Sequence, residues 1–292
     1  MTVNGKTSVC AIIGDPVEHS LSPVIHNAAF KKLGLNLVYV AFTVTSPELK
    51  TAILGAKSLG LRGLNVTMPH KNAVMKYLDE VDSAAKPIGA VNTILNNQGK
   101  LIGYNTDGSG AMIALQENGV YPEEKKLVLL GAGGAAKAIA YQAAQDVEEL
   151  VILNRTQEKA KKLAEALKSL GAKVKAGTLS SKVLEEELPT TDILVNATSV
   201  GMHPDVDVSP VPSDLLHSEL SVMDIIYKPL KTKFLKDAKS AGANVVSGIE
   251  MLLYQGVVAF EIWTNCLAPI EVMREAALNE LKKQVYVFDW KS

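Results

Sequence analysis

Short runs rich in β-branched residues alternate with longer helical patterns along most of this 292-residue chain. The first three alternations are VCAIIG before SPVIHNAAFKKLG, VYVAFTV before PELKTAILGAKSLG, and LRGLNVT before KNAVMKYL. Because parallel strands need crossover helices, this rhythm predicts βαβ units and a largely parallel sheet. A predicted hairpin at 90–107 interrupts the rhythm, and a fresh strand–helix series begins near residue 125. We therefore expect an α/β fold of two domains, with a boundary near residues 105–120.

A glycine-rich turn opens the second series. Residues 131–136 read GAGGAA, follow the strand KLVLL and precede an alanine-rich helix, which is the G-x-G-x-x-A form of a dinucleotide-binding turn. Gly131 allows the tight turn, Gly133 lets a pyrophosphate approach the backbone, and Ala136 keeps the helix close to the strand. The N-terminus of that helix favours an anion. The turn therefore predicts a dinucleotide site, against the alternative of a tight turn that binds nothing.

The tip of the next strand indicates which dinucleotide binds. An acid about 20 residues after the turn binds the ribose diol of NAD, whereas ELVILNR ends in Asn154, Arg155 and Thr156. A carboxylate would repel a 2′-phosphate, and a guanidinium can bind it through two hydrogen bonds. The sequence thus favours NADP over NAD. Lys159, one helical turn further on, either adds positive charge to this site or belongs to a solvated lysine-rich helix face.

Composition excludes several other classes of protein. With 30 Lys and Arg against 31 Asp and Glu, the chain has a net charge of −1 and no strongly basic field for nucleic acid. It has no apolar run of about 18 residues for a membrane span, and the N-terminus MTVNGKTSVC does not resemble a signal peptide, which favours the cytoplasm. Two cysteines and five histidines without an H-E-x-x-H pattern predict no metal site, and His26 is expected in the core. Composition does not indicate the oligomeric state, so a homodimer is left open.

Polar clusters follow the strands of the first series, where α/β sheets place their binding sites. A helix N-cap before Pro23 would account for Ser22, because serine is favoured at that position. Capping does not account for Ser20. Lys71 would open a helix, where its charge opposes the macrodipole, so it is either solvated or positioned for use. Asp107 after the hairpin is a candidate site residue or a simple N-cap. A lysine, a carboxylate and neighbouring neutral polar groups suit a small polyhydroxylated acid better than a nucleotide or a metal.

On these residues the chain resembles the shikimate dehydrogenase family, NADP-dependent enzymes that reduce 3-dehydroshikimate to shikimate in chorismate and aromatic amino acid biosynthesis. Nine motifs occur in the family's order over nearly the whole chain. They are S-x-S at 20–22, N-V-T-x-P-x-K at 65–71, A-V-N-T at 90–93, N-T-D-G at 105–108, G-A-G-G-A-A at 131–136, N-R-T at 154–156, N-A-T-S-V-G-M at 196–202, D-I-I-Y-x-P at 224–229 and G-x-E-M-L-x-x-Q-G at 248–256.

The resemblance implies a fold and a set of residue roles. The fold is an N-terminal α/β substrate domain, which we place at 1–106 and 250–292, and a Rossmann-like NADP-binding domain at 107–249, with an open cleft between them. Lys71 and Asp107 are the implied catalytic pair. The substrate ligands are these two with Ser20, Ser22, Asn65, Thr67, Asn92, Tyr227 and Gln255. The cofactor ligands, with Lys159 added from its position alone, are Gly131, Ala132, Gly133, Gly134, Ala135, Asn154, Arg155, Thr156, Thr198, Ile225, Gly248, Met251 and Leu252.

The implied reaction moves a hydride to a ketone carbon, and the new alkoxide needs a proton. Lys71 can be the general acid, with Asp107 holding its ammonium and tuning its pKa, and Tyr227 is the alternative donor. A quinate/shikimate dehydrogenase with relaxed substrate or cofactor use, a non-catalytic dinucleotide-binding protein and a folate dehydrogenase remain as alternatives. The absence of an acid at the strand tip weighs against the first alternative, and the presence of Lys71 and Asp107 weighs against the second. An aromatic content of 5% weighs against the folate dehydrogenase, which would need a pterin site. The role of residues 285–292 is not predicted.

Overall fold

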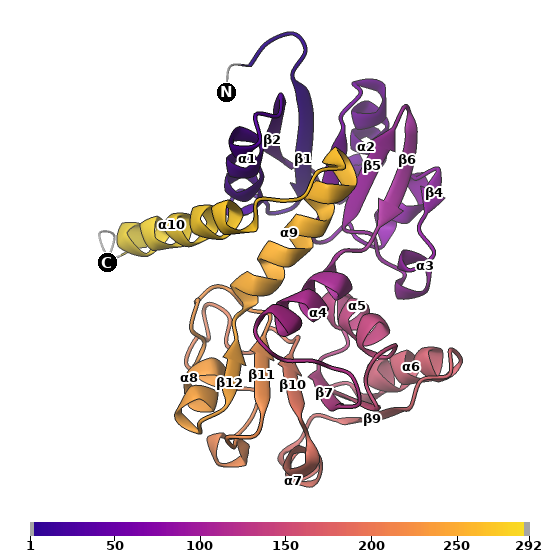
Figure 1. Cartoon of the computed structure of the whole chain (residues 1–292). Helices are drawn as coiled ribbons and strands as arrows, with labels where there is room; N and C mark the ends of the chain where they lie inside the picture. The colour runs from indigo at the N-terminus through magenta and orange to yellow at the C-terminus, as the bar shows by residue number, and fades with distance from the viewer. Residues whose placement is uncertain (1–2, 289–292) are drawn as a thin grey trace. The chain divides into compact units, whose positions relative to one another are not determined.

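The computed structural model describes residues 3–288, which contain two six-stranded sheets (Figure 1). The chain divides into two compact units: Met1–Thr106 with Gln255–Ser292, and Asp107–Tyr254. It passes between them twice, once just before helix α4 (Asp107–Glu117) and once inside helix α9 (Gly248–Thr264). None of the helices within residues 3–288 is long and apolar enough to cross a membrane.

The first unit is built on a sheet with the strand order β2-β1-β3-β5-β6-β4. The strands are β1 (Ser8–Gly14), β2 (Leu37–Thr43), β3 (Gly63–Val66), β4 (Glu80–Val81), β5 (Thr93–Asn97) and β6 (Lys100–Tyr104). Strand β1 pairs in parallel with β2 and β3, which confirms the predicted βαβ units. Strands β5 and β6 form the predicted antiparallel hairpin, and β5 joins it to β3. The helical elements of this part are α1 (Ser22–Lys32), η1 (Ser46–Glu48), α2 (Leu49–Ser58), η2 (Ala73–Tyr77) and α3 (Ala85–Ile88).

One predicted helix of this unit is wrong. The segment 71–78 forms only the short 3₁₀ helix η2, and Lys71 lies in the turn before it. The segment is tied at both ends, because the Lys71 carbonyl accepts from Val91 N–H (2.8 Å) and Leu78 is already extended toward β4. Only Val74 is buried between these ties, which leaves no apolar face to support a longer helix. The argument from a helix dipole at Lys71 therefore does not apply.

Two C-terminal elements complete the core of the first unit. They are the part of α9 from Gln255 onward and α10 (Ile270–Phe288), which packs on α1. Buried Trp263 of α9 donates its indole N–H to the Ile94 carbonyl (2.9 Å), and Arg62 donates to the Trp263 carbonyl (2.7 Å). Residues 289–292 of the C-terminal segment lie outside the described residues.

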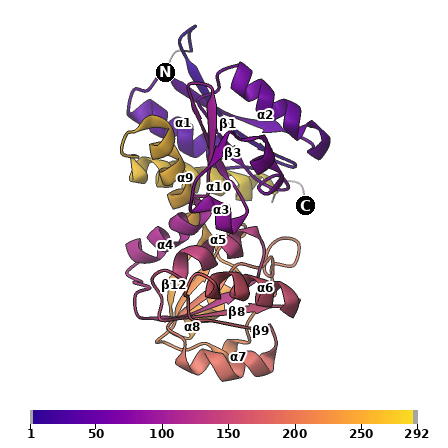
Figure 2. The same cartoon turned by 90° about the vertical axis from the view of Figure 1, so that its right-hand side faces the viewer.

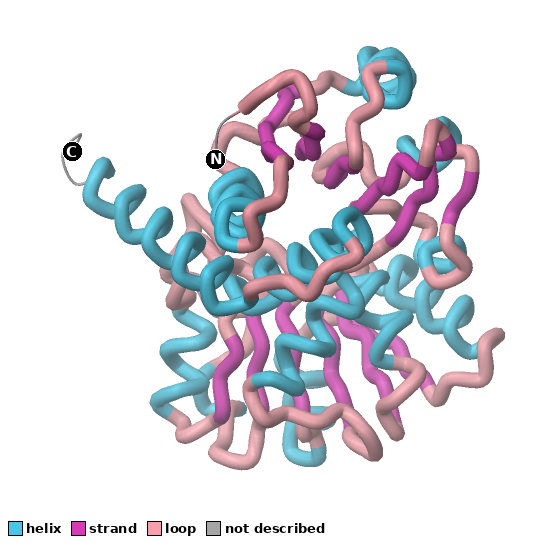
Figure 3. The backbone as a smooth tube through the Cα atoms, turned by 45° about the horizontal axis from the view of Figure 1, so that its top comes forward, coloured by secondary structure: helices cyan, strands magenta, loops and turns pink. Residues whose placement is uncertain are grey.

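The second unit is a parallel sheet with the strand order β12-β11-β10-β7-β8-β9. The strands are β7 (Lys126–Leu130), β8 (Glu149–Asn154), β9 (Val174–Thr178), β10 (Ile193–Asn196), β11 (Ser221–Asp224) and β12 (Asn244–Val246). Besides α4, its helices are α5 (Gly134–Ala143), α6 (Gln157–Lys168), α7 (Ser181–Glu187), η3 (Leu188–Thr190), η4 (Ser213–Leu215) and α8 (Lys233–Ser240). Helices pack on both faces of this sheet (Figures 2 and 3). This order is that of the doubly wound Rossmann fold, with the switch point between β7 and β10, and it confirms the predicted Rossmann-like domain.

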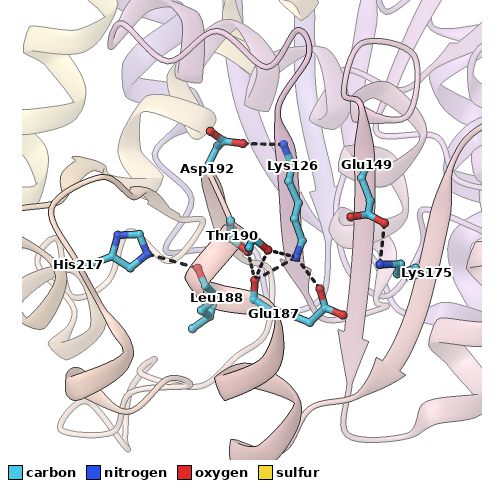
Figure 4. A network of polar contacts seen from close by, with 9 residues as sticks. Lys126, Glu149, Lys175, Glu187, Leu188, Thr190, Asp192 and His217 are labelled. Carbon is cyan, nitrogen blue, oxygen red and sulfur yellow. Dashed lines mark hydrogen bonds and ion pairs between the residues drawn. The ribbon is translucent and has the colours of Figure 1, made fainter.

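A polar network ties the amino ends of these strands (Figure 4). The Lys126 ammonium donates to Thr190 Oγ1 (2.8 Å) and the Glu187 carbonyl (3.0 Å), and it pairs with the Glu187 carboxylate (2.6 Å). The Lys126 backbone N–H donates to Asp192 (2.8 Å). Ligands of open α/β sheets bind at the carboxyl ends of the strands. The network therefore has a structural role, and the candidate cofactor residues lie at the other edge of the sheet.

Candidate functional site

The glycine turn joins β7 to α5 at the switch point. Gly131 has a φ of +114°, and a Cβ on it would lie 2.7 Å from the Ala197 carbonyl oxygen, so only glycine fits there. Gly133 is the N-cap of α5, which receives no side-chain cap, and a Cβ on Gly133 or Gly134 would meet nothing within 4 Å. Ala136 is fully buried. The N–H groups that open α5 thus face open space on the side of the two exposed glycines, which fits a pyrophosphate.

The tip of β8 presents a cation. Asn154 donates from Nδ2 to the Thr156 carbonyl (2.9 Å), and Thr156 is the N-cap of α6. Arg155 lies exposed in the turn between them, and within residues 3–288 it forms no ion pair with a carboxylate. Lys159 is exposed in the first turn of α6. Asn154 therefore shapes the turn, while the guanidinium of Arg155 stays available for an anion.

The loop after β10 lies beside the glycine turn, and the loop after β11 lies beside the start of α9. A Cβ on Gly131 would stand 3.4 Å from Thr198 Cγ2, and one on Gly248 would stand 2.5 Å from the Ile225 carbonyl oxygen. Gly248 therefore lets α9 begin directly against the end of β11. The structure thus brings Thr198 next to the turn, and Ile225 next to Gly248. Farther along α9, Met251 is buried, Leu252 is half-buried, and half-buried Gln255 belongs to the first unit.

A buried carboxylate, which sequence reasoning missed, holds these two loops. Asp224 is fully buried and accepts from Asn196 Nδ2 (3.0 Å), the Ile226 N–H (3.1 Å) and Thr232 Oγ1 (2.7 Å). Asn196 in turn accepts from the Thr198 hydroxyl (2.7 Å). Burial raises the pKa of Asp224 to about 6, although the three hydrogen bonds oppose the rise. Asp224 begins the motif D-I-I-Y-x-P, and Asn196 begins N-A-T-S-V-G-M. Both residues therefore stand in motifs that the sequence analysis identified, although it assigned neither residue a role.

In the first unit, four polar side chains between β3 and the end of β6 form one buried network. Asn65 donates from Nδ2 to the Asn92 carbonyl (3.2 Å) and Thr93 Oγ1 (3.1 Å). Asn92 donates to Thr106 Oγ1 (3.0 Å) and accepts from the Thr106 N–H (2.8 Å). The structure therefore brings two predicted substrate ligands, Asn65 and Asn92, into a rigid array at the carboxyl end of β3.

The residue that caps helix α1 differs from the expected one. Helix α1 begins at Ser22 with Leu21 as its N-cap, so the expected N-cap role of Ser22 is wrong. Leu21 already has helical φ and ψ, and Ser20 Oγ accepts from the Ser22 N–H (3.2 Å). Ser20 thus supports the start of the helix, and the Ser22 hydroxyl is not engaged as a cap.

The loop that carries Lys71 is fixed to the ends of β1 and β2. Thr67 donates its N–H to the Ile13 carbonyl (2.9 Å), and buried His70 has Nε2 at 2.6 Å from the Val44 carbonyl. Lys71 follows as a half-buried residue. His70, to which the sequence assigned no role, therefore helps to fix the backbone next to Lys71.

The two remaining titratable candidates lie in the second unit. Asp107 is the first residue of α4 rather than the residue before it, and it is only 6% exposed. Its burial exceeds what a solvent-exposed N-cap requires. Tyr227, after β11, is half-buried, and burial raises the pKa of its phenol.

Comparison with known proteins assigns three segments to models of one family. Residues 12–94 match the shikimate dehydrogenase substrate binding domain, 113–224 match shikimate/quinate 5-dehydrogenase, and 248–278 match the shikimate 5′-dehydrogenase C-terminal domain. The shikimate dehydrogenase (NADP(+)) of Methanopyrus kandleri is 51% identical over 286 residues, which are 97% of this chain and 99% of the relative.

Solved structures agree with this assignment. A shikimate dehydrogenase crystallised with NADP+ is 48% identical with a TM-score of 0.90, and the alignment covers 96% of this chain and 98% of that one. The shikimate 5-dehydrogenase of Listeria monocytogenes, in complex with shikimate and NAD, is 42% identical with a TM-score of 0.91 over 94% and 98% of the two chains.

Proposed function

Because the chain belongs to the shikimate dehydrogenase family, we propose that it catalyses the reversible NADPH-dependent reduction of 3-dehydroshikimate to shikimate, a step toward chorismate and the aromatic amino acids. The observation that carries the proposal is the carboxyl edge of the second sheet. There, two exposed glycines open α5, and the turn after the neighbouring strand β8 carries exposed Arg155 instead of an acid. This pairing suits a dinucleotide with a 2′-phosphate.

Each part of NADPH has a matching set of residues in this proposal. The backbone of residues 131–135 would hold the pyrophosphate, and Arg155 with Asn154, Thr156 and Lys159 would hold the 2′-phosphate. The residues that would hold the nicotinamide are Thr198, Ile225, Gly248, Met251 and Leu252. When bound, NADPH supplies the hydride. Asp224 holds the loops that carry Thr198 and Ile225 through its bonds to Asn196 and Ile226.

Protein side chains manage the proton and the orientation of the substrate. Lys71 donates a proton from Nζ to the alkoxide oxygen that forms at the reduced carbon, and it takes the proton back in the reverse direction. Asp107 is the second member of the proposed catalytic pair, and its carboxylate would accept a hydrogen bond from a substrate hydroxyl. We prefer Lys71 to Tyr227 as the donor, because burial raises the pKa of the phenol and makes it a weaker acid at neutral pH.

The remaining proposed substrate ligands are neutral polar side chains. Ser20 and Ser22 offer hydroxyl groups near the start of α1, and Thr67 offers another in the loop that leads to Lys71. Asn65 and Asn92 belong to the buried network of the first unit. Tyr227 and Gln255 complete the set. Neutral donors and acceptors of this kind match hydroxyl groups and a carboxylate on one ring.

The test is a spectrophotometric assay on the purified chain. NADPH absorbance should fall when 3-dehydroshikimate is added, and it should rise when shikimate is added to the chain with NADP+. Absence of any change with shikimate, quinate or 3-dehydroshikimate, using both NADP(H) and NAD(H), would contradict the proposal and favour a dinucleotide-binding protein without catalysis.

The same assay addresses the alternative of a quinate/shikimate dehydrogenase with relaxed use of substrate or cofactor. The family model that matches residues 113–224 covers both activities by its description, which keeps this alternative in place. Arg155 weighs against NAD, since a guanidinium gains little from an unphosphorylated ribose. Comparable kcat/KM values for quinate and shikimate would favour the alternative. Light scattering on the same sample distinguishes a homodimer from a monomer.

A further inference from the structure

We propose that Tyr39 is a positioning residue that fixes the side-chain amide of Asn65, so that Asn65 meets the substrate as a hydrogen-bond acceptor for a hydroxyl group and not as a donor to the carboxylate. This inference rests on the proposed function and adds the chemical group that Asn65 recognises. All the residues that carry it belong to the first unit.

Tyr39 is held rigidly on strand β2. The Asn27 side-chain amide makes two hydrogen bonds to the backbone of Tyr39. Asn27 Nδ2 donates to the Tyr39 carbonyl (2.8 Å), and Asn27 Oδ1 accepts from the Tyr39 N–H (2.9 Å). The ring of His26 stacks on the Tyr39 ring with 4.5 Å between centroids, and Trp263 lies at 5.9 Å from it. Only 2% of Tyr39 is exposed. The phenol oxygen therefore has one well-defined position.

That oxygen lies 2.6 Å from Asn65 Oδ1 in a buried hydrogen bond. Burial raises the pKa of Tyr39 well above its usual value, so the phenol stays protonated and donates at any working pH. On the other side of the amide, the Asn92 carbonyl can only accept. A donor on one side and an obligatory acceptor on the other leave a single orientation for the amide, with Oδ1 toward Tyr39 and Nδ2 toward Asn92.

The hydrogen-bonding capacity of Asn65 then limits its use. An amide has two N–H donors and two oxygen lone pairs. Both donors are taken, one by the Asn92 carbonyl and one by Thr93 Oγ1, and one lone pair is taken by Tyr39. Only one acceptor position remains. A carboxylate offers no hydrogen to that position, whereas a hydroxyl group of the substrate does.

Tyr39→Phe tests the inference, because it removes the phenol oxygen and keeps the stacked ring. The KM for shikimate should rise about five- to thirtyfold, the factor for one buried hydrogen bond, while kcat falls less and the KM for NADP+ stays unchanged. Tyr121→Phe, at an exposed tyrosine of the second unit, is the matched control and should behave like the wild type. An unchanged KM for shikimate in folded Tyr39→Phe would overturn the inference.

Two further measurements separate positioning from general damage. The Tyr39 phenol also hydrogen-bonds the Ser22 side chain, so the background for the double-mutant test carries both Asn65→Ala and Ser22→Ala. If Tyr39 acts through Asn65, Tyr39→Phe should have no additional effect on the KM in that background and a larger effect where only Ser22→Ala is present; equal effects in the two backgrounds would overturn the inference. The penalty of Tyr39→Phe should vanish with the shikimate analogue that lacks the recognised hydroxyl and persist with an analogue in which a carboxamide replaces the carboxylate. The reverse pattern would assign Asn65 to the carboxylate.

A second variant keeps the test decisive if Tyr39→Phe fails to fold. Asn65→Ala removes the proposed acceptor itself without touching the aromatic stack, and it should raise the KM for shikimate but not for the analogue that lacks the recognised hydroxyl. An equal rise in KM for both compounds would overturn the inference. Activity of the wild type tests the proposed function by itself, since the Tyr39 inference depends only on ratios between variant and wild type.

Discussion

Trp263 on α9 lies against Gly63 on β3 so closely that a Cβ on residue 63 would stand 2.7 Å from the indole Cε2 atom. The same indole donates its N–H to the Ile94 carbonyl on β5. A residue near the end of the chain thus packs into the sheet formed by the first hundred residues, at a point where the absence of a side chain makes room for it.

Gly63→Ala should destabilise the chain by about 1–3 kcal/mol, the usual cost of overpacking a core. Trp263 cannot yield easily, because it is fully buried and held by its hydrogen bond. The free energy of unfolding from a urea titration measures the effect. Gly55→Ala in α2 is the control, since its Cβ meets nothing within 4 Å, and it should stabilise by about 0.5–1 kcal/mol. Equal shifts in the two variants would contradict the packing argument.

His26→Phe should make the chain more stable, and increasingly so toward acid. The structure confirms His26 as a core residue, and neither ring nitrogen has a hydrogen-bond partner among the described residues. Burial lowers the pKa of His26 from 6.5 to about 3, so below pH 6.5 the unfolded chain binds a proton that the folded chain does not. The wild type should lose about 1.4 kcal/mol per pH unit relative to the variant below pH 6.5.

Unfolding free energies at several pH values between about 7 and 5 measure this difference, within the range set by the pKa of His26. His203→Gln, at an exposed histidine, is the control for the loss of an imidazole from the surface. A constant difference between His26→Phe and the wild type across this range would show that His26 titrates normally.

Asp224→Asn should change stability with the opposite dependence on pH. The pKa of Asp224 rises from 3.8 to about 6 in the folded chain. The contribution of the Asp224 proton to the free energy of unfolding is therefore fully present below pH 3.8 and is lost as the pH rises through about 6. Relative to Asp224→Asn, the wild type should therefore lose stability from about pH 4 to pH 6 and show a constant difference above. Thermal unfolding across this range measures it, with exposed Asp205→Asn as the control. Parallel curves for wild type and Asp224→Asn would refute the shifted pKa.

Arg155→Asp should weaken NADPH binding by about 10–150-fold, the factor for losing charge-assisted hydrogen bonds. The substitution replaces an exposed guanidinium at the tip of β8 by the acid that NAD-binding units carry there. Fluorescence titration with NADPH and NADH measures both affinities, and the affinity for NADH should not fall in parallel. A variant that binds NADPH as the wild type does would remove Arg155 from the cofactor site.

Lys71→Ala should lower kcat by about 10²–10⁴-fold, the range for general acid–base catalysis. The KM for NADP+ should change little, because the proposed cofactor residues belong to the other unit. Steady-state rates in both directions measure the loss, and Lys76→Ala, at an exposed lysine of η2, is the control. Turnover close to wild type in Lys71→Ala would transfer the role of proton donor to another group, of which Tyr227 is the first candidate.

Local patterns predicted much of this protein. The strand–helix alternation, the hairpin at 90–107 and the GAGGAA turn are each written in residues that are neighbours in sequence, so their periodicity and turn chemistry were readable. The candidate cofactor residues Gly131, Gly133 and Arg155 lie in two such segments. The motif that carries Lys71 was also readable, but its helix was not, because ties to Val91 and to the β4 segment override local helical preference.

The sequence by itself determined the α/β class, the family and the chemical types of the candidate ligands. Only the tertiary structure decided which of these groups keep hydrogen-bonding capacity for a ligand. Asn65 and Tyr39 are 26 residues apart, Asn196 and Asp224 are 28 apart, and Trp263 and Ile94 are 169 apart. Such contacts leave no periodic signal in the chain. They arise when packing removes polar groups from water, which obliges each buried donor or acceptor to find a partner wherever the fold brings one near.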